Sequence, residues 1–140
     1  MATYYLDTSA IYKRVQVENG SQALVKHLTH LSQTGSRLLT SALTWIELER
    51  SLRRYNAQTK ALDELQIDQA VKDATLGLDQ VRITSRVVSA ARWIGPLPLR
   101  SLDAIHLASA VLSQATVLVT YDQRLIEAAR SVKLAVESPV

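Results

Sequence analysis

Residues 3–10 read Thr3-Tyr4-Tyr5-Leu6-Asp7-Thr8-Ser9-Ala10, and this stretch decides how the rest of the chain is interpreted. A short run of strand-forming residues ends abruptly on a carboxylate and two hydroxyls, and a helical pattern follows at once. If the run is a central strand of a parallel sheet, Asp7 lies at the carboxyl edge of that sheet, where open α/β sheets bind their ligands. The question for the remaining sequence is which other acidic residues return to this edge.

Length and composition narrow the class of protein. The chain has 140 residues, enough for one domain over residues 1–140, and it has no cysteine, which excludes disulfide scaffolds, zinc–thiolate sites and thiol nucleophiles. We find neither a signal-peptide pattern nor an apolar run near the ~18 residues of a membrane span, so we expect a soluble, cytoplasmic protein. The net charge of +3 permits a nucleic-acid partner without requiring one.

Apolar segments and turn residues alternate along the chain in a way typical of strands followed by helices. We predict strands at residues 3–6, 38–40, 80–83 and 116–120, and an edge strand at 133–136. We predict helices at residues 9–17, 21–33, 43–55, 60–78, 84–94, 101–114 and 122–130, with a break at 56–59. This alternation favours a three-layer α/β/α domain with a central parallel sheet of four to five strands.

Four acidic residues fall where such a fold would bring them together. Asp7 and Asp122 each follow a predicted strand, Glu47 lies one turn into the helix after the second strand, and Asp103 lies in the first turn of the helix at 101–114. Helix starts that follow parallel strands share the sheet's carboxyl edge. Carboxylates packed together repel unless a cation neutralises them, and Mg²⁺ or Mn²⁺ prefers oxygen ligands. Such a site can activate a water for attack on a phosphodiester.

Each of these acids also has a purely structural explanation. Asp7 and Asp122 can cap the helices that follow them, and Thr44-x-x-Glu47 matches a capping box. A negative charge at Asp103 favours the dipole of its helix. The shared placement of all four at one edge is what favours a metal site.

Several other polar residues are candidates for supporting roles. Thr8, Ser9 and Thr120 can orient the carboxylates or hold metal-bound water, although helix caps and strand ends explain them equally well.

A second group of candidates could contact RNA. Arg50, Arg53 and Arg54 share one helix face by i, i+3, i+4 spacing and could follow an RNA backbone, although a solvated face is the commoner meaning of such a cluster. Arg100 and His106 flank Asp103 and are further candidates for RNA contact. A helix histidine whose hydrogen bonds are satisfied within the protein is the alternative for His106.

Four segments together resemble the PIN-domain ribonucleases, and among them the VapC toxins of type II toxin–antitoxin pairs. They are residues 5–10 (YLDTSA), 41–48 (SALTWIEL), 99–108 (LRSLDAIHLA) and 119–122 (VTYD), in the family's order and at about its spacing. The family often has Phe where this chain has Leu125, a departure that leaves the acids untouched.

The resemblance implies a metal-dependent endoribonuclease. Asp7, Glu47 and Asp103 would be the principal ligands of Mg²⁺ or Mn²⁺, Asp122 would complete the site, and metal-activated water would hydrolyse RNA. The resemblance also implies a homodimer and a cognate VapB-like antitoxin that blocks the cleft.

Two alternatives belong to other functional classes. A PIN-like domain could bind RNA or a partner without turnover. A phosphoacceptor signalling domain also groups acids and Mg²⁺ at a sheet edge, but it would need paired N-terminal acids and a Lys after a late strand. Here Leu6 precedes Asp7, and Lys133 begins the predicted last strand.

Overall fold

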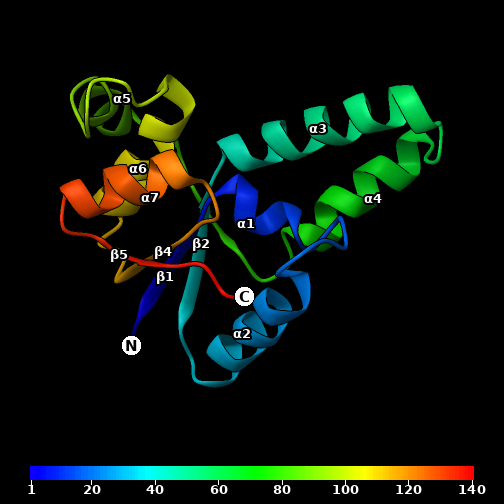
Figure 1. Ribbon diagram of the computed structural model, residues 1–140, viewed down its shortest axis with the longest axis horizontal. Coiled ribbons are helices and arrows are strands. Elements are labelled where there is room, and N and C mark those ends of the chain that lie inside the picture. Colours follow the sequence, from blue (N-terminus) through cyan, green and yellow to red (C-terminus); the bar gives the residue numbers. More distant parts are fainter.

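The computed structural model describes residues 1–140 and contains a five-stranded, all-parallel sheet in the order β3-β2-β1-β4-β5 (Figure 1). The strands are β1 (Thr3–Leu6), β2 (Arg37–Ser41), β3 (Asp79–Val81), β4 (Val117–Val119) and β5 (Ala135–Glu137). The predicted parallel sheet is confirmed, and its first strand is central. The predicted edge strand near the end of the chain is β5.

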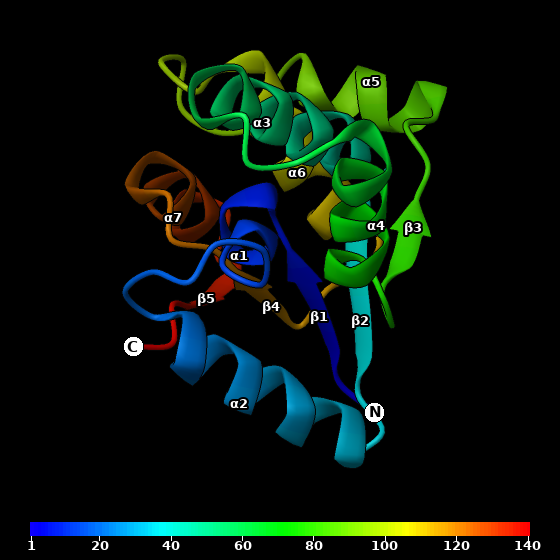
Figure 2. The same cartoon turned by 90° about the vertical axis from the view of Figure 1, so that its right-hand side faces the viewer.

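Seven helices connect and cover these strands. They are α1 (Thr8–Tyr12), α2 (Ser21–Gln33), α3 (Leu43–Thr59), α4 (Glu64–Ala74), α5 (Ser85–Ala91), α6 (Ser101–Leu112) and α7 (Gln123–Ser131). Figures 1 and 2 both show α2 at the opposite end of the sheet from α3, and Figure 1 shows α3 and α4 extending together to one side of the sheet.

The alternation of side chains along the strands builds one core on each face of the sheet, because successive side chains in a strand point to opposite faces. Leu6, Leu38 and Val119 pack in a cluster with residues of α1, α2, α3 and α4. Tyr5, Leu39 and Leu118 pack in a second cluster with residues of α6 and α7. The result is the predicted three-layer α/β/α arrangement.

Some helix ends differ from the prediction. Helix α1 ends at Tyr12 rather than near residue 17, and α3 continues through the predicted break at 56–59. Asn56 stays helical. Its side-chain oxygen accepts a hydrogen bond from the N–H of Leu62 at 2.7 Å, and so it stabilises the loop after the helix instead of a turn at 56–59. The helix ends instead at Lys60, whose φ of 52° is left-handed.

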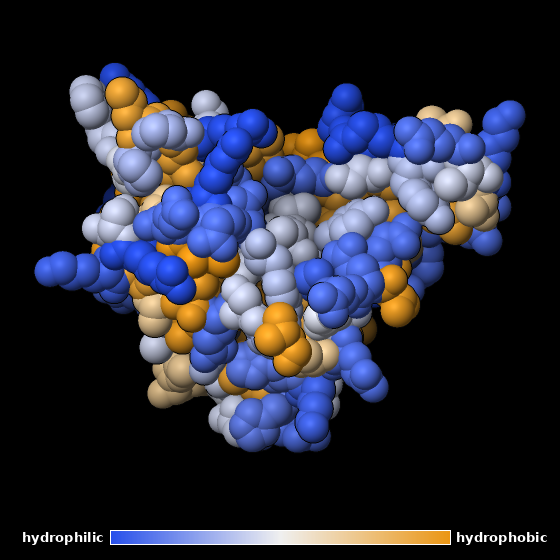
Figure 3. Space-filling model, in the orientation of Figure 1, coloured by the Kyte–Doolittle hydropathy of each residue, from blue (hydrophilic) through white to orange (hydrophobic).

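The face of the molecule in Figure 3 is mostly hydrophilic, with hydrophobic residues in several small groups scattered among the polar ones. No helix combines the length and the apolar character that a membrane crossing requires.

Candidate active site

The site begins where two neighbouring strands end. Leu6 of β1 is paired with Val119 of β4, so Asp7 and Thr120, the next residue of each strand, emerge side by side at the carboxyl edge. The Asp7 N–H continues the ladder to the Val119 carbonyl at 3.3 Å. The Thr120 hydroxyl donates to Asp7 Oδ2 at 2.8 Å. The sheet register therefore fixes the position of Asp7.

Both oxygens of Asp7 are hydrogen-bonded, and its side chain is only 4% exposed. Oδ1 accepts from the Ser9 hydroxyl at 2.7 Å and from the Ala10 N–H at 3.1 Å, which makes Asp7 the N-cap of α1. Burial raises the pKa of Asp7, and the nearby His106 and these hydrogen bonds offset only part of that rise. The cap and the buried charge are thus properties of one residue, and a cap does not exclude a ligand.

Glu47 does not form the capping box that its spacing suggested. The N-cap of α3 is Ala42, without a side-chain cap bond, and the Thr44 hydroxyl bonds to Thr40 at 2.6 Å instead. Glu47 Oε1 accepts from the Thr8 hydroxyl at 2.6 Å, and it lies 2.7 Å from His106 Nε2.

The pKa of Glu47 reflects two opposing effects. Burial raises it, but the hydrogen bonds from His106 and Thr8 and the nearby imidazole outweigh burial and lower the pKa overall. Glu47 therefore holds its negative charge readily at this edge.

Asp103, in the first turn of α6, makes no hydrogen bond to the protein and is partly exposed. Burial raises its pKa, and the charge of Asp122 raises it further. The imidazole of His106 acts in the opposite direction, while Asp7 and Glu47 again raise it. Asp122, Asp7 and Glu47 are therefore near enough to Asp103 for their charges to raise its pKa, while the metal site itself stays a prediction.

Asp122 is the N-cap of α7, as its alternative explanation proposed. Its Oδ1 accepts from the backbone N–H groups of Arg124 at 2.9 Å and Leu125 at 3.2 Å. Oδ2 has no partner within the protein and stays available to a ligand.

The supporting hydroxyls link these acids. Ser9 Oγ accepts from the Tyr121 N–H at 3.0 Å and lies 3.3 Å from Thr120 Oγ1. Thr120 Oγ1 in turn accepts from the Asp122 N–H at 3.1 Å. One hydroxyl, Thr120, therefore touches two of the four acidic residues.

His106 was predicted to contact RNA, but it is 2% exposed and both ring nitrogens are engaged inside the protein. Nδ1 lies 2.8 Å from the Tyr5 hydroxyl, and Nε2 lies 2.7 Å from Glu47. A direct RNA contact from His106 does not fit this structure, because the imidazole is covered. Sequence reasoning missed Tyr5 altogether, although a tyrosine in a buried strand needs a partner for its hydroxyl.

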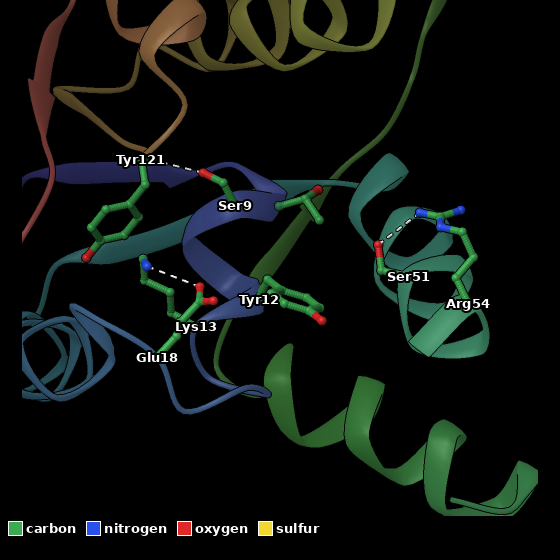
Figure 4. Close-up of a pocket in the computed structure, with 8 residues that line it drawn as sticks. Ser9, Tyr12, Lys13, Glu18, Ser51, Arg54 and Tyr121 are labelled. Atoms are coloured by element: carbon green, nitrogen blue, oxygen red, sulfur yellow. Dashed lines mark hydrogen bonds and ion pairs between the residues drawn. The ribbon is translucent and has the colours of Figure 1, made fainter. Parts of the chain in front are cut away.

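A cleft of about 460 Å³ adjoins Thr8 and Ser9. Figure 4 shows Lys13 paired with Glu18, 3.1 Å apart, and Arg54 bonded to Ser51 at the opposite side. Tyr12 and Tyr121 also line this cleft.

The predicted arginines are distributed differently around the site. Of the arginines on α3, only Arg54 lines the cleft, while Arg53 bonds to Glu49 at 3.3 Å and Arg50 is exposed. Arg100 is the N-cap residue that precedes α6, and it lines a separate cleft with Arg124.

The donor set suits a hard divalent cation. The unpartnered oxygens are Glu47 Oε2, Asp122 Oδ2 and both oxygens of Asp103, all of them carboxylate. No group of three or more histidine, aspartate or glutamate side chains is arranged so that it could hold a metal ion. Mg²⁺ does not need one, because it keeps several waters and uses one or two protein carboxylates directly. These residues therefore fit a partly hydrated ion of this kind.

Fold and site together define an α/β protein with acidic residues and supporting hydroxyls at the carboxyl edge of a parallel sheet, beside a cleft that Thr8 and Ser9 line. The PIN domain family profile matches residues 4–131, and the chain belongs to the PIN-domain family. Within it, the chain is similar to the VapC proteins. It is 40% identical to Ribonuclease VapC35 and to Ribonuclease VapC47 of Mycobacterium tuberculosis, each over 139 residues covering 96% of both chains.

A solved structure confirms the fold at much lower sequence identity. The chain superimposes with a TM-score of 0.74 on a chain of VapBC2 from Rickettsia felis, bound to a DNA fragment from its promoter. That chain is 15% identical, with 99% of each chain covered.

Proposed function

We propose that this protein is a divalent-metal-dependent endoribonuclease that acts as the toxin of a type II toxin–antitoxin pair. The observation that carries the proposal is Asp103, a carboxylate without protein partners whose pKa is raised by burial and by three other acids. A group of like charges held this way is stabilised by a bound cation. The relatives named ribonucleases support RNA as the substrate.

The residues that would hold Mg²⁺ or Mn²⁺ are Asp7, Glu47, Asp103 and Asp122. A bound divalent cation supplies a nucleophile from water at neutral pH and neutralises charge that builds on the phosphate. Asp7 contributes a fixed charge, because three hydrogen bonds hold its two oxygens. Asp103, by contrast, is free to adjust to a ligand.

The cleft beside Thr8 and Ser9 would receive the RNA strand. Arg54 supplies an exposed guanidinium for a phosphate, and the charge of Lys13 is partly balanced by Glu18. RNA binding would thus depend on Arg54 more than on Arg53, which already pairs with Glu49.

We further propose a cognate VapB-like antitoxin as partner, since structures that share this fold include VapBC assemblies from Rickettsia felis and nontypeable Haemophilus influenzae. The homodimer stays a prediction, which the mass of the purified protein in solution would test.

The test of the proposed function is cleavage of total cellular RNA by the purified protein in Mg²⁺, in Mn²⁺ and in EDTA. Asp7→Asn and Asp103→Asn are assayed beside it, with circular dichroism to verify folding. We expect discrete fragments that require metal and that disappear in both variants.

Two outcomes would contradict the proposal. Equal cleavage by the wild type and both variants would assign the activity to a contaminant. A folded wild type that cleaves no RNA and binds RNA equally with and without metal would favour a binding domain without turnover.

A further inference from the structure

Three buried or half-buried side chains form a hydrogen-bonded chain that ends at a residue of the candidate site. Tyr5 lies in the central strand, His106 in α6 and Glu47 in α3, so the hydrogen-bonded chain joins one strand to two helices. The Tyr5 hydroxyl is 2.8 Å from His106 Nδ1, and His106 Nε2 is 2.7 Å from Glu47 Oε1. The two rings also meet edge to face, with centroids 5.9 Å apart. Because the three residues lie far apart in sequence, these contacts come from the packing of different elements and not from spacing within one helix.

The direction of the first hydrogen bond follows from what lies at the other end of the imidazole. The side chain of Tyr5 is fully buried, and its hydroxyl lies 2.8 Å from the His106 ring, with Ser41 and Ser109 also beside it. Glu47 Oε1 lies 2.7 Å from His106 Nε2 and, as a carboxylate oxygen, can only accept, so Nε2 holds the proton of a neutral ring and Nδ1 is the acceptor. A tyrosine phenol, with an ordinary pKa of about 10, keeps its proton at neutral pH. Tyr5 therefore donates to Nδ1.

The two hydrogen bonds of the His106 ring together fix its tautomer. A neutral imidazole has one donor and one acceptor nitrogen, and the hydrogen bond at one nitrogen decides the role of the other. With Nδ1 accepting from Tyr5, the proton is on Nε2 and points at Glu47 Oε1. The Thr8 hydroxyl donates to the same oxygen at 2.6 Å. Glu47 Oε1 is thus held by two donors, whereas Oε2 has none.

We propose that His106 is a positioning residue that, oriented by Tyr5, holds the Glu47 carboxylate by Oε1 and leaves Oε2 for the divalent cation. The inference rests on the proposed metal-dependent function and adds a residue to it. Thr8 is the second donor of the same clamp. His106 itself touches neither the cation nor the RNA, because it is covered by the protein.

The competing explanation is that His106 merely fills the core between β1 and α6. Two amide variants separate these explanations, since each retains one end of the imidazole. His106→Gln places an N–H donor near the position of Nε2, and His106→Asn places an amide near the position of Nδ1. Both replace an aromatic ring by an amide and disturb packing to a comparable degree, so only the hydrogen bond to Glu47 differs systematically.

The first experiment measures the affinity of Mn²⁺ by electron paramagnetic resonance for the wild type, His106→Gln, His106→Asn and Tyr5→Phe. Loss of a hydrogen bond that orients a ligand typically costs about 10- to 100-fold in metal affinity or activity. We expect a loss of that size in His106→Asn, a smaller loss in His106→Gln, and an intermediate loss in Tyr5→Phe. With saturating Mn²⁺, kcat for RNA cleavage should follow the same order with KM for RNA nearly unchanged.

The second experiment needs neither metal nor activity. The ¹⁵N shifts of the His106 ring in the metal-free wild type should report a proton on Nε2 and an unprotonated Nδ1. Tyr5→Phe should keep this tautomer, because the Glu47 carboxylate still accepts from Nε2, and should shift the Nδ1 resonance, which loses its donor. A wild-type ring protonated on Nδ1 alone would overturn the inference, even if the amide variants failed to fold.

The outcomes also separate this inference from the proposed function. A folded wild type that binds no Mn²⁺ contradicts the proposed function itself. A wild type that binds Mn²⁺ and cleaves RNA, beside a His106→Asn protein with equal affinity and equal kcat, contradicts only the positioning role.

Discussion

Thr120 and Asp7 are 113 residues apart in sequence, yet the Thr120 hydroxyl donates to Asp7 Oδ2 at 2.8 Å. The contact exists because β1 and β4 are neighbours in parallel register, and both residues follow the last pair of that ladder. The same hydroxyl accepts from the Asp122 N–H. One side chain therefore couples the end of the central strand to the start of the last helix.

Thr120→Val should lower the free energy of unfolding by about 1–3 kcal/mol, since it leaves the buried Asp7 Oδ2 and the partly buried Asp122 N–H without this partner while conserving shape. The matched control is Thr116→Val at the other end of β4, where the hydroxyl accepts an exposed bond from the Thr3 N–H. Urea unfolding of both variants measures the difference. Equal losses in the two would show that the Thr120 bonds contribute no more than an exposed one.

Asp7→Asn should change the pH dependence of stability in the metal-free protein. Because the folded pKa of Asp7 is raised, its contribution is complete below the unfolded value, about 3.9, and is lost as pH rises through the folded value. The variant does not titrate there. The melting temperature of Asp7→Asn minus that of the wild type should therefore increase as pH rises above about 4.

Glu47→Gln is the control of opposite sign. The folded pKa of Glu47 is lowered, so its contribution is present above the unfolded value and is lost as pH falls through the folded one. The wild type should gain stability relative to this variant as pH rises through the acidic range. Differential scanning calorimetry without metal checks both slopes, and slopes of the same sign would contradict the burial argument.

Much of the fold could be predicted because its signals are local. The spacing of Leu24, Leu28 and Leu31 predicts α2 with its observed ends. The apolar runs at residues 3–6 and 116–120 predict the buried strands β1 and β4. The carboxyl edge of a parallel sheet then predicts that Asp7 and Asp122 approach one another, whatever the packing details.

What failed depends on contacts between distant segments. The sequence allows Glu47 to bond either to the start of its own helix or to a residue of another helix. The structure shows a contact with His106 of α6, 59 residues further along, and this contact depends on how α6 packs against α3. The same packing covers His106 and removes it from any RNA surface. Helix spacing alone gives no sign of Tyr5, because its partner lies 101 residues further along.

Mg²⁺ or Mn²⁺ should raise the melting temperature of the wild type, because a ligand that binds only the folded state stabilises it. At 100 times the dissociation constant the gain is about 2.7 kcal/mol. Asp103→Asn should reduce this shift, since it removes the carboxylate without protein partners and the repulsion that the other acids exert on it. Scanning fluorimetry with a metal series measures the effect. Asp73→Asn is the control, because Asp73 is an exposed residue of α4. A full shift in Asp103→Asn would remove that residue from the proposed site.

Arg54→Ala should weaken RNA binding through the loss of one phosphate contact and leave the metal site intact, because Arg54 lines a cleft whose lining includes none of the four acidic candidates. For single-stranded RNA, one lost contact should reduce the slope of log affinity against log salt by about 0.7. KM should rise, and kcat at saturating RNA should stay close to the wild-type value.

Arg53→Ala is the matched control, because that guanidinium is one residue away and already pairs with Glu49. Fluorescence anisotropy over a salt series, with Asp103→Asn as a non-cleaving background, separates binding from turnover. If Arg53→Ala reduces the slope as much as Arg54→Ala does, the RNA follows the whole arginine face of α3 rather than the cleft.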